Sequence, residues 1–122
     1  MAVDPDTVRR LALALPEVDD RSGADRLAFE VAGKGIAWTY LVRAAPRKPR
    51  TPQIGVLAVR CEITRKEMLI AAAPDRFFDD DHYRGFPAVL VRLDQADADD
   101  LAGLLRDAWR IQAPKALRVP LS

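Results

Sequence analysis

The sequence holds little of what extracellular or membrane proteins need. It has a single cysteine, Cys61, so an intramolecular disulfide cannot form. No apolar run approaches the ~20 residues that span a bilayer. Residues 1–6 show neither the basic nor the apolar segment of a secretory signal. These absences predict a cytoplasmic protein with no disulfide framework and no membrane partner.

Residues for nucleophilic or metal chemistry are equally scarce. His82 is the only histidine, and no glycine-flanked serine elbow or Cys/His metal pattern is present. Cys61 falls on the apolar face of an expected strand, which predicts a buried structural thiol. The acidic run 79–81 lies beside His82, but consecutive loop side chains point in different directions and no second acidic cluster completes a cation site. We therefore predict a protein that is not an enzyme and that uses no metal and no cofactor.

The composition itself is that of an ordinary globular protein. The 122 residues are 49% hydrophobic and 30% charged. A chain of this size buries enough surface to fold without a covalent or metal staple. We expect one domain over residues 1–122, with one core.

Hydrophobic periodicity predicts an α+β fold in the order α-β-β-β-α-β-α, with an antiparallel sheet and helices packed on it. The helices are expected to begin after Asp4, at a capping box starting at Thr64, and near Asp94 or Asp97. Prolines should end them at about residues 15, 73 and 113. Alternating apolar residues predict strands at 27–31, 36–42, 54–63 and 88–93, and the segment 17–26 leaves room for another short strand.

The pattern also predicts which side chains form the core. Every second residue of the second expected strand is apolar, so one face should hold Ile36, Trp38, Tyr40 and Val42. Trp109 follows the apolar stripe of the last helix by one residue. We expect it to pack against the sheet, with stacking of a nucleobase or a small ligand on it as the alternative.

Basic residues are unevenly distributed. Residues 31–61 hold six basic residues and no acidic one, whereas the rest of the chain has an acidic excess. Three prolines within residues 46–52 predict an extended, exposed loop rather than a central strand. Cations on such a loop suit phosphate oxygens, although a solvated loop is the simpler alternative. The predicted nucleic-acid contacts are Arg43, Arg47, Lys48 and Arg50 on the loop, extended by Lys34 and Arg60 on the sheet.

Two other functions stay open at this point. Free strand edges would suit a protein-interaction or regulatory module, including a homodimer. A small-molecule or anion-binding protein would need a pocket, for which the first candidates are Lys34, Arg60, His82, Tyr83 and Trp109.

Several segments, in this order along the chain, resemble the MmcQ/YjbR family, whose members are also described as double-wing proteins. The most specific segment is Asp81-His82-Tyr83-Arg84-Gly85-Phe86-Pro87, which leads into the expected strand 88–93. The resemblance spans about residues 7–117, and its other parts are 7–18, 29–37, 56–61 and 108–115.

The resemblance implies an α+β fold similar to double-wing and CyaY-like proteins. Family members are commonly named DNA-binding proteins, which implies weak, non-specific DNA binding here. The family carries no catalytic residue set to transfer. Many relatives place a tryptophan after the proline that precedes the fourth strand, where this chain has Ala88.

Overall fold

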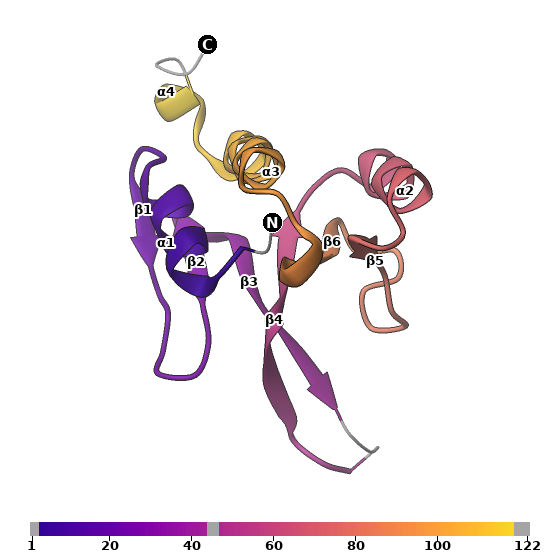
Figure 1. Ribbon diagram of the computed structural model, residues 1–122. Coiled ribbons are helices and arrows are strands. Elements are labelled where there is room, and N and C mark those ends of the chain that lie inside the picture. Colours follow the sequence, from indigo (N-terminus) through magenta and orange to yellow (C-terminus); the bar gives the residue numbers. More distant parts are fainter. Residues whose placement is uncertain (1–2, 44–46, 119–122) are drawn as a thin grey trace.

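A six-stranded antiparallel sheet forms the framework of the protein (Figure 1). The computed structural model describes residues 3–43 and 47–118. The strands lie in the order β1-β2-β3-β4-β6-β5. They are β1 (Val18–Asp20), β2 (Ala28–Val31), β3 (Lys34–Arg43), β4 (Arg50–Arg60), β5 (Phe77–Phe78) and β6 (Ala88–Arg92). The helices are α1 (Pro5–Leu13), α2 (Ile63–Ala72), the 3-10 helix η1 (Leu93–Gln95), α3 (Ala98–Gln112) and α4 (Lys115–Arg118). This architecture confirms the predicted α+β fold.

Two helices begin where their capping residues predict. Asp4 Oδ1 accepts a hydrogen bond from Thr7 N at 2.8 Å, and Asp97 Oδ2 accepts one from Asp100 N at 3.1 Å. The capping box expected at Thr64 is not formed, because α2 begins at Ile63 and Thr64 lies inside its first turn. None of the helices in the described ranges is long and apolar enough to cross a membrane.

The structure contains the short strand for which the segment 17–26 left room, and it adds one strand that the sequence pattern did not specify. β1 occupies part of the acidic connection 17–26 and pairs with β2. β5 contains only Phe77 and Phe78, which is too short for an alternating pattern to be visible. The hairpin between β2 and β3 turns at Ala32 and Gly33, whose φ angles are 52° and 79°, so Lys34 already belongs to β3.

We expected Ile36 to lie on the same face of β3 as Trp38 and Tyr40, and this prediction is wrong. Phe29 of β2 pairs with Ala37 and Glu30 pairs with Gly35, so Ile36 is an extra residue in the strand. Such a bulge interrupts the alternation of side chains. Ile36 and Ala37 therefore both pack in the core on the helix side.

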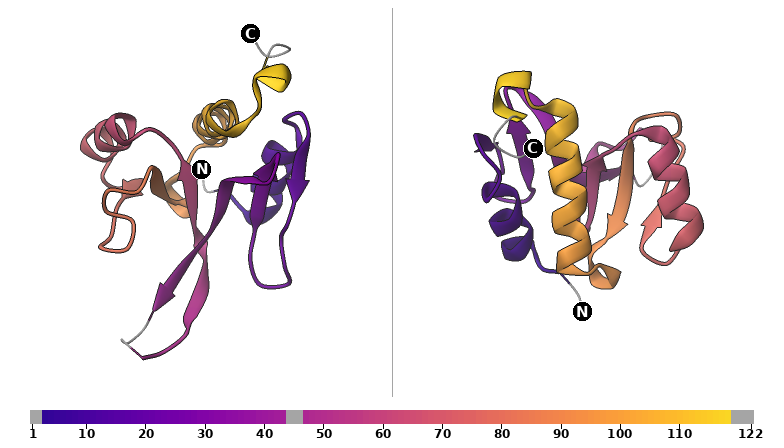
Figure 2. Two further views of the ribbon diagram at one scale, coloured as in Figure 1. Left: turned by 180° about the vertical axis from the view of Figure 1, so that it is seen from behind. Right: turned by 90° about the horizontal axis from the view of Figure 1, so that it is seen from above.

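The sheet carries two cores instead of the single core that we expected. On one face, the strands pack against α1 and α3, and the large buried side chains include Phe29, Leu57, Leu101 and Trp109 (Figure 2). The opposite face has a smaller cluster of Tyr40, Val56, Ala58, Tyr83, Ala88 and Leu90, with Trp38, Val42 and Phe78 half-buried against it. Residues 56–59 of β4 are buried throughout because both faces are covered at this strand.

Candidate nucleic-acid interface

The hairpin of β3 and β4 extends beyond the sheet as a two-stranded arm, residues 40–43 and 47–55 (Figures 1 and 2). β2 pairs with β3 only as far as Trp38, and β6 pairs with β4 only from Val56. Thr39 N still donates to the Leu27 carbonyl oxygen at 2.9 Å, and from Tyr40 onward the two strands pair only with each other, out to Arg43 opposite Arg50. The end of the arm therefore presents side chains that the body of the protein does not cover, whereas Tyr40 and Arg50 contact Asp80 and His82 of the body.

Part of the expected proline-rich loop is strand, which corrects the prediction for residues 50–52. Pro52 lies in β4, opposite Leu41. A proline is tolerated there because this stretch of β4 has no further strand beside it that needs an N–H group. The register shifts between Thr39 and Tyr40, where Tyr40 pairs with Gln53. Such an irregularity bends and twists a hairpin.

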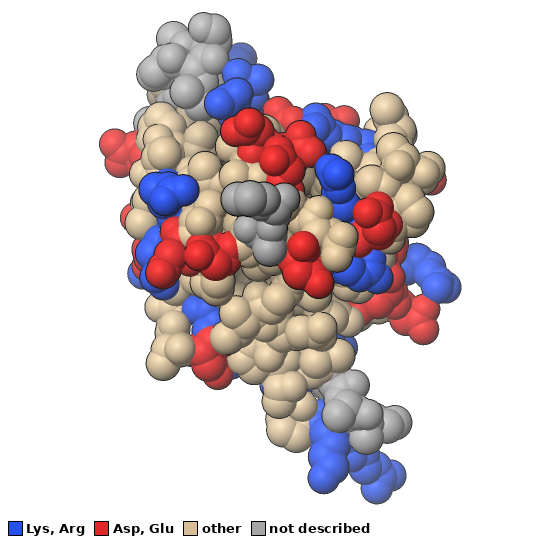
Figure 3. Space-filling model, viewed as in Figure 1, with Lys and Arg blue, Asp and Glu red and all other residues tan. Residues whose placement is uncertain are grey.

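Two of the predicted arm cations are free at the end of the arm. Arg47 and Lys48 are exposed, and neither forms an ion pair with a described residue. Figure 3 shows blue side chains at this projecting end and a broad uncharged surface between it and the body. Arg43 ends β3, and its side chain lies outside what the structure describes.

Arg50, the fourth predicted arm cation, is partly engaged within the protein. Its Nη1 donates to the carbonyl oxygen of Leu41 at 3.1 Å, and its Nη2 lies 3.3 Å from Nδ1 of His82. Arg50 thus connects the arm to the loop 79–87, which lies against the same face of the sheet as Tyr40 and Tyr83.

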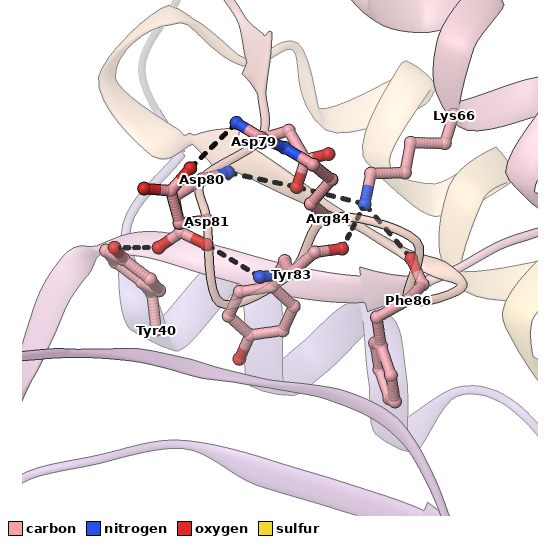
Figure 4. A network of polar contacts seen from close by, with 8 residues as sticks. All are labelled: Tyr40, Lys66, Asp79, Asp80, Asp81, Tyr83, Arg84 and Phe86. Atoms are coloured by element: carbon pink, nitrogen blue, oxygen red, sulfur yellow. Dashed lines mark hydrogen bonds and ion pairs between the residues drawn. The ribbon is translucent and has the colours of Figure 1, made fainter.

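A buried lysine fixes that loop to α2 (Figure 4). Lys66 is 3% exposed, and its Nζ donates to the carbonyl oxygens of Tyr83 and Phe86 at 2.8 and 3.0 Å. It also pairs with Asp79 Oδ1 at 3.0 Å. An ammonium group has three protons to donate, so these three partners satisfy it. Lys66 is therefore a structural clamp.

The acidic residues 79–81 likewise form contacts with other residues of the protein. Asp80 accepts a hydrogen bond from Tyr83 N at 2.8 Å and another from the Tyr40 hydroxyl, and Asp81 pairs with Arg84 at 2.7 Å. Burial, together with the hydrogen bond to Asp80, raises the pKa of Tyr40 to about 12. Residues 3–43 and 47–118 contain no group of three or more His, Cys, Asp or Glu placed to hold a metal ion.

Further arginine and aromatic side chains lie on the face of the sheet that carries Tyr40 and Tyr83. Trp38 Nε1 donates to the Tyr83 hydroxyl at 2.9 Å, and Phe86 packs edge-on against both rings. The Arg60 guanidinium lies 5.6 Å from the centre of the Phe86 ring, and its buried Nε has no hydrogen-bond partner within the described ranges. Arg60 is thus held by stacking rather than by an acid.

A groove lies at the base of the arm, between Tyr40 and the strands β5 and β6. Its volume is about 570 Å³. The Arg92 guanidinium lies 4.1 Å from the centre of the Phe78 ring, and the Phe78 ring meets that of Tyr40 edge-on at 6.3 Å. The lining residues are Tyr40, Val42, Gln53, Gly55, Val56, Phe78, Arg92 and Asp94.

The prediction that Lys34 and Arg60 extend the cationic surface of the loop is wrong. Lys34 begins β3, whereas Arg43 ends it, and Arg60 is at the far end of β4 from Arg50. At ~3.3 Å per residue, about 30 Å separates the two ends of these strands. Lys34 and Arg60 therefore belong to the body of the protein and not to the arm.

The five residues of the alternative pocket do not meet in one site. Trp109 is fully buried on the helix side, where its Nε1 donates to the Pro16 carbonyl oxygen at 2.8 Å. Tyr83 is buried on the other face of the sheet. The expected packing of Trp109 against the sheet is confirmed, and its burial excludes stacking on a ligand. Cys61 is 2% exposed, and burial raises the pKa of its thiol, which makes it a poor nucleophile.

The outer strands of the sheet offer little backbone to a second chain. β1 has three residues and β5 has two. Short edge strands present few free N–H and C=O groups for pairing. The strands of the arm, by contrast, have free backbone edges at residues 40–43 and 50–55, where a second chain could pair, so the homodimer hypothesis is not weakened by the short outer strands.

The sequence analysis did not identify the residues that line the groove as a site. Tyr40, Phe78 and Arg92 come from three different strands, and Phe78 and Arg92 were not singled out at all. The feature of the sequence that could have pointed to the groove is the absence of charge from two stretches, residues 35–42 and 51–59, inside the basic segment 31–61.

This fold defines a small α+β protein built on one antiparallel sheet with helices packed on one face. Within that class, the chain belongs to the YjbR family, whose model matches residues 13–111. The match confirms the resemblance seen in the sequence.

Proteins similar to this chain occur in several bacteria. It is 34% identical over 119 residues to the uncharacterized proteins Rv2570 of Mycobacterium tuberculosis and Mb2600 of Mycobacterium bovis, and each match covers 92% of this chain and 90% of the relative. Among solved structures, the DUF419 protein DR2400 of Deinococcus radiodurans matches with a TM-score of 0.67 and 24% identity, over 97% of this chain and 87% of that one. A Pseudomonas syringae protein matches with a TM-score of 0.61 and 11% identity, over 90% and 99% of the two chains. These two structures share the fold.

Proposed function

We propose that this protein is a non-enzymatic, cytoplasmic binding protein that contacts the sugar–phosphate backbone of nucleic acid through the β3–β4 arm. The observation that carries the proposal is the pair of exposed, unpaired cations, Arg47 and Lys48, at the end of a projecting arm. Cations in this position neutralise phosphates and release counterions, which favours binding without a sequence preference.

The binding is expected to be weak because few cations are free. Arg50 already contacts Leu41 and His82, and Lys34 and Arg60 lie at the other end of the strands. If Arg47 and Lys48 each neutralise one phosphate of a duplex, the slope of log K against log salt is about −2.

Fluorescence anisotropy of a short labelled duplex, titrated at several salt concentrations, tests this function. The variant Arg47→Ala/Lys48→Ala should lose most of the salt-dependent binding. Arg10→Ala/Arg106→Ala is the matched control, because it removes the same charge from exposed positions on α1 and α3. Equal losses in the two variants, or no binding by the wild type even at low salt, would refute the role of the arm.

A further inference from the structure

The groove at the base of the arm is lined by side chains that suit a flat group. Phe78 and Arg92 form one wall, since the guanidinium lies 4.1 Å from the centre of the ring. Tyr40, Val42 and Val56 supply the neighbouring surface. Aromatic rings and arginine planes are the surfaces on which nucleobases stack.

The walls of the groove are held in place by contacts outside it. The Tyr40 hydroxyl donates to Asp80, and Tyr40 is only 8% exposed. Arg92 Nη1 donates to the carbonyl oxygen of Pro74 at 3.1 Å. A ligand would therefore meet a preformed surface, which lowers the entropic cost of binding.

Two polar side chains on the groove lining have unused hydrogen-bonding capacity. Gln53 and Asp94 are exposed, and neither side chain has a partner within the described ranges. An amide offers donors and an acceptor, and a carboxylate accepts from N–H groups, so together they suit the edge of a base. Gly55 leaves the space beside them open, because a Cβ added there would meet no atom within 4 Å.

The position of the groove relative to the arm cations selects the kind of ligand. Tyr40 and Gln53 form a pair three positions before the Arg43–Arg50 pair on β3 and β4. At ~3.3 Å per residue the paired strands continue about 10 Å beyond the groove, and the free cations Arg47 and Lys48 lie past the Arg43–Arg50 pair, so one nucleic-acid strand lying along the arm can reach both. Asp94 disfavours a ligand bound through its negative charge at the groove itself.

We infer that the groove at the base of the arm receives an unpaired nucleobase, so that this protein binds single-stranded nucleic acid more tightly than duplex. The inference rests on the proposed function of the arm and adds the class of nucleic acid to it. Bases stacked inside a duplex cannot enter the groove unless they leave the helix, which costs a few kcal/mol. A single strand presents them without that cost.

Anisotropy titrations with three labelled DNA probes test the inference. The probes are a mixed-sequence single strand, its duplex, and a strand of the same length in which abasic linkers replace the nucleosides and keep the phosphates. The intact single strand should bind about 5- to 100-fold more tightly than the abasic strand, which is the range that stacking of one base supports. Equal affinities for the intact and abasic strands would overturn the inference.

A variant that fills the groove without changing its charge tests whether the base binds in the groove. Gly55→Val places a side chain in the open space, and valine suits a strand. It should reduce affinity for the intact strand to that for the abasic strand, with the salt dependence unchanged. Thr51→Val is the control on the arm outside the groove lining. An unchanged preference for the intact strand in Gly55→Val would overturn the inference.

The two proposals fail in different ways in this experiment. If Arg47→Ala/Lys48→Ala loses binding to all probes while base content has no effect, the arm function stands and the groove inference is overturned. If that variant keeps both the salt dependence of the wild type and the preference for the intact strand, the role of the arm is refuted and the groove is supported. If none of the probes binds to the wild type at low salt, both proposals fail.

Discussion

Arg50 Nη2 lies 3.3 Å from His82 Nδ1, and this contact joins the projecting arm to the loop 79–87. Because of this contact, Arg50 differs from the cations at the end of the arm, which are free. Arg50 stabilises the base of the arm, whereas Arg47 and Lys48 extend into solvent. The separation predicts unequal contributions to nucleic-acid binding from neighbouring basic residues.

Single substitutions of these residues should separate the two roles. Arg47→Ala or Lys48→Ala should each make the salt slope for a duplex shallower by about 0.9, because each removes one phosphate contact. Arg50→Ala should change the slope less, since its guanidinium is already engaged by Leu41 and His82. Anisotropy titrations over a salt series measure the slopes, and an effect of Arg50→Ala larger than that of Lys48→Ala would contradict the assignment.

The loop 79–87 should depend on one buried side chain. Lys66→Met removes all three interactions of the ammonium group and leaves Asp79 and two carbonyl oxygens without their donor. We expect the free energy of unfolding to fall by about 2–4 kcal/mol. Urea denaturation measures the loss, and hydrogen exchange should show faster exchange in the loop.

An exposed ion pair of the same loop is the control for Lys66. The side chains of Arg84 and Asp81 are 77% and 93% exposed, although their atoms lie 2.7 Å apart. Arg84→Ala should change the free energy of unfolding by less than about 0.5 kcal/mol. A loss in Arg84→Ala equal to that in Lys66→Met would show that the clamp is not the main fixation of the loop.

Tyr40 should make the protein less stable at high pH. Its pKa in the folded state is raised to about 12 from 10.0, first by burial and then by the hydrogen bond to Asp80. The unfolded chain therefore loses the phenolic proton at lower pH than the folded one. This contribution to stability is complete below pH 10 and disappears as the pH rises from about 10 to about 12.

Urea denaturation of the wild type and of Tyr40→Phe, at a series of pH values, measures this contribution. The wild type should lose more stability than the variant across that interval, and absorbance titration should show ionisation of Tyr40 near pH 12. Burial also raises the pKa of Tyr83, which remains in both proteins and serves as the internal reference. Parallel pH profiles for the two proteins would contradict the prediction.

The sequence predicted the positions of the strands far better than the pairing and contacts between them. Alternation placed β2, β3, β4 and β6 within a few residues, because local patterns record which side of a strand is apolar. The same alternation misplaced Ile36, since a bulge depends on pairing with β2 and leaves no periodic signal. β5 is too short to have a period at all.

The candidate site shows the same limit. The free cations Arg47 and Lys48 were predicted because a proline-rich, acid-free segment is visible in the sequence alone. The groove was not predicted, because Phe78 and Arg92 meet Tyr40 only after three strands have been arranged in one sheet. Contacts between residues that are distant in sequence are set by tertiary packing, which composition and periodicity do not encode.

Trp109 provides a test of the helix-side core. Its indole is fully buried, and its Nε1 donates to the Pro16 carbonyl oxygen across 93 residues of sequence. Trp109→Phe keeps an aromatic ring but leaves that carbonyl unpaired and a small cavity beside it, so the free energy of unfolding should fall by about 2–4 kcal/mol. Trp38→Phe should cost less, because Trp38 is only half-buried. Urea denaturation compares the two variants, and acrylamide should quench the remaining tryptophan far more weakly in Trp38→Phe than in Trp109→Phe. Strong quenching of Trp109 would contradict its burial and reopen the helix side of the sheet as a binding surface.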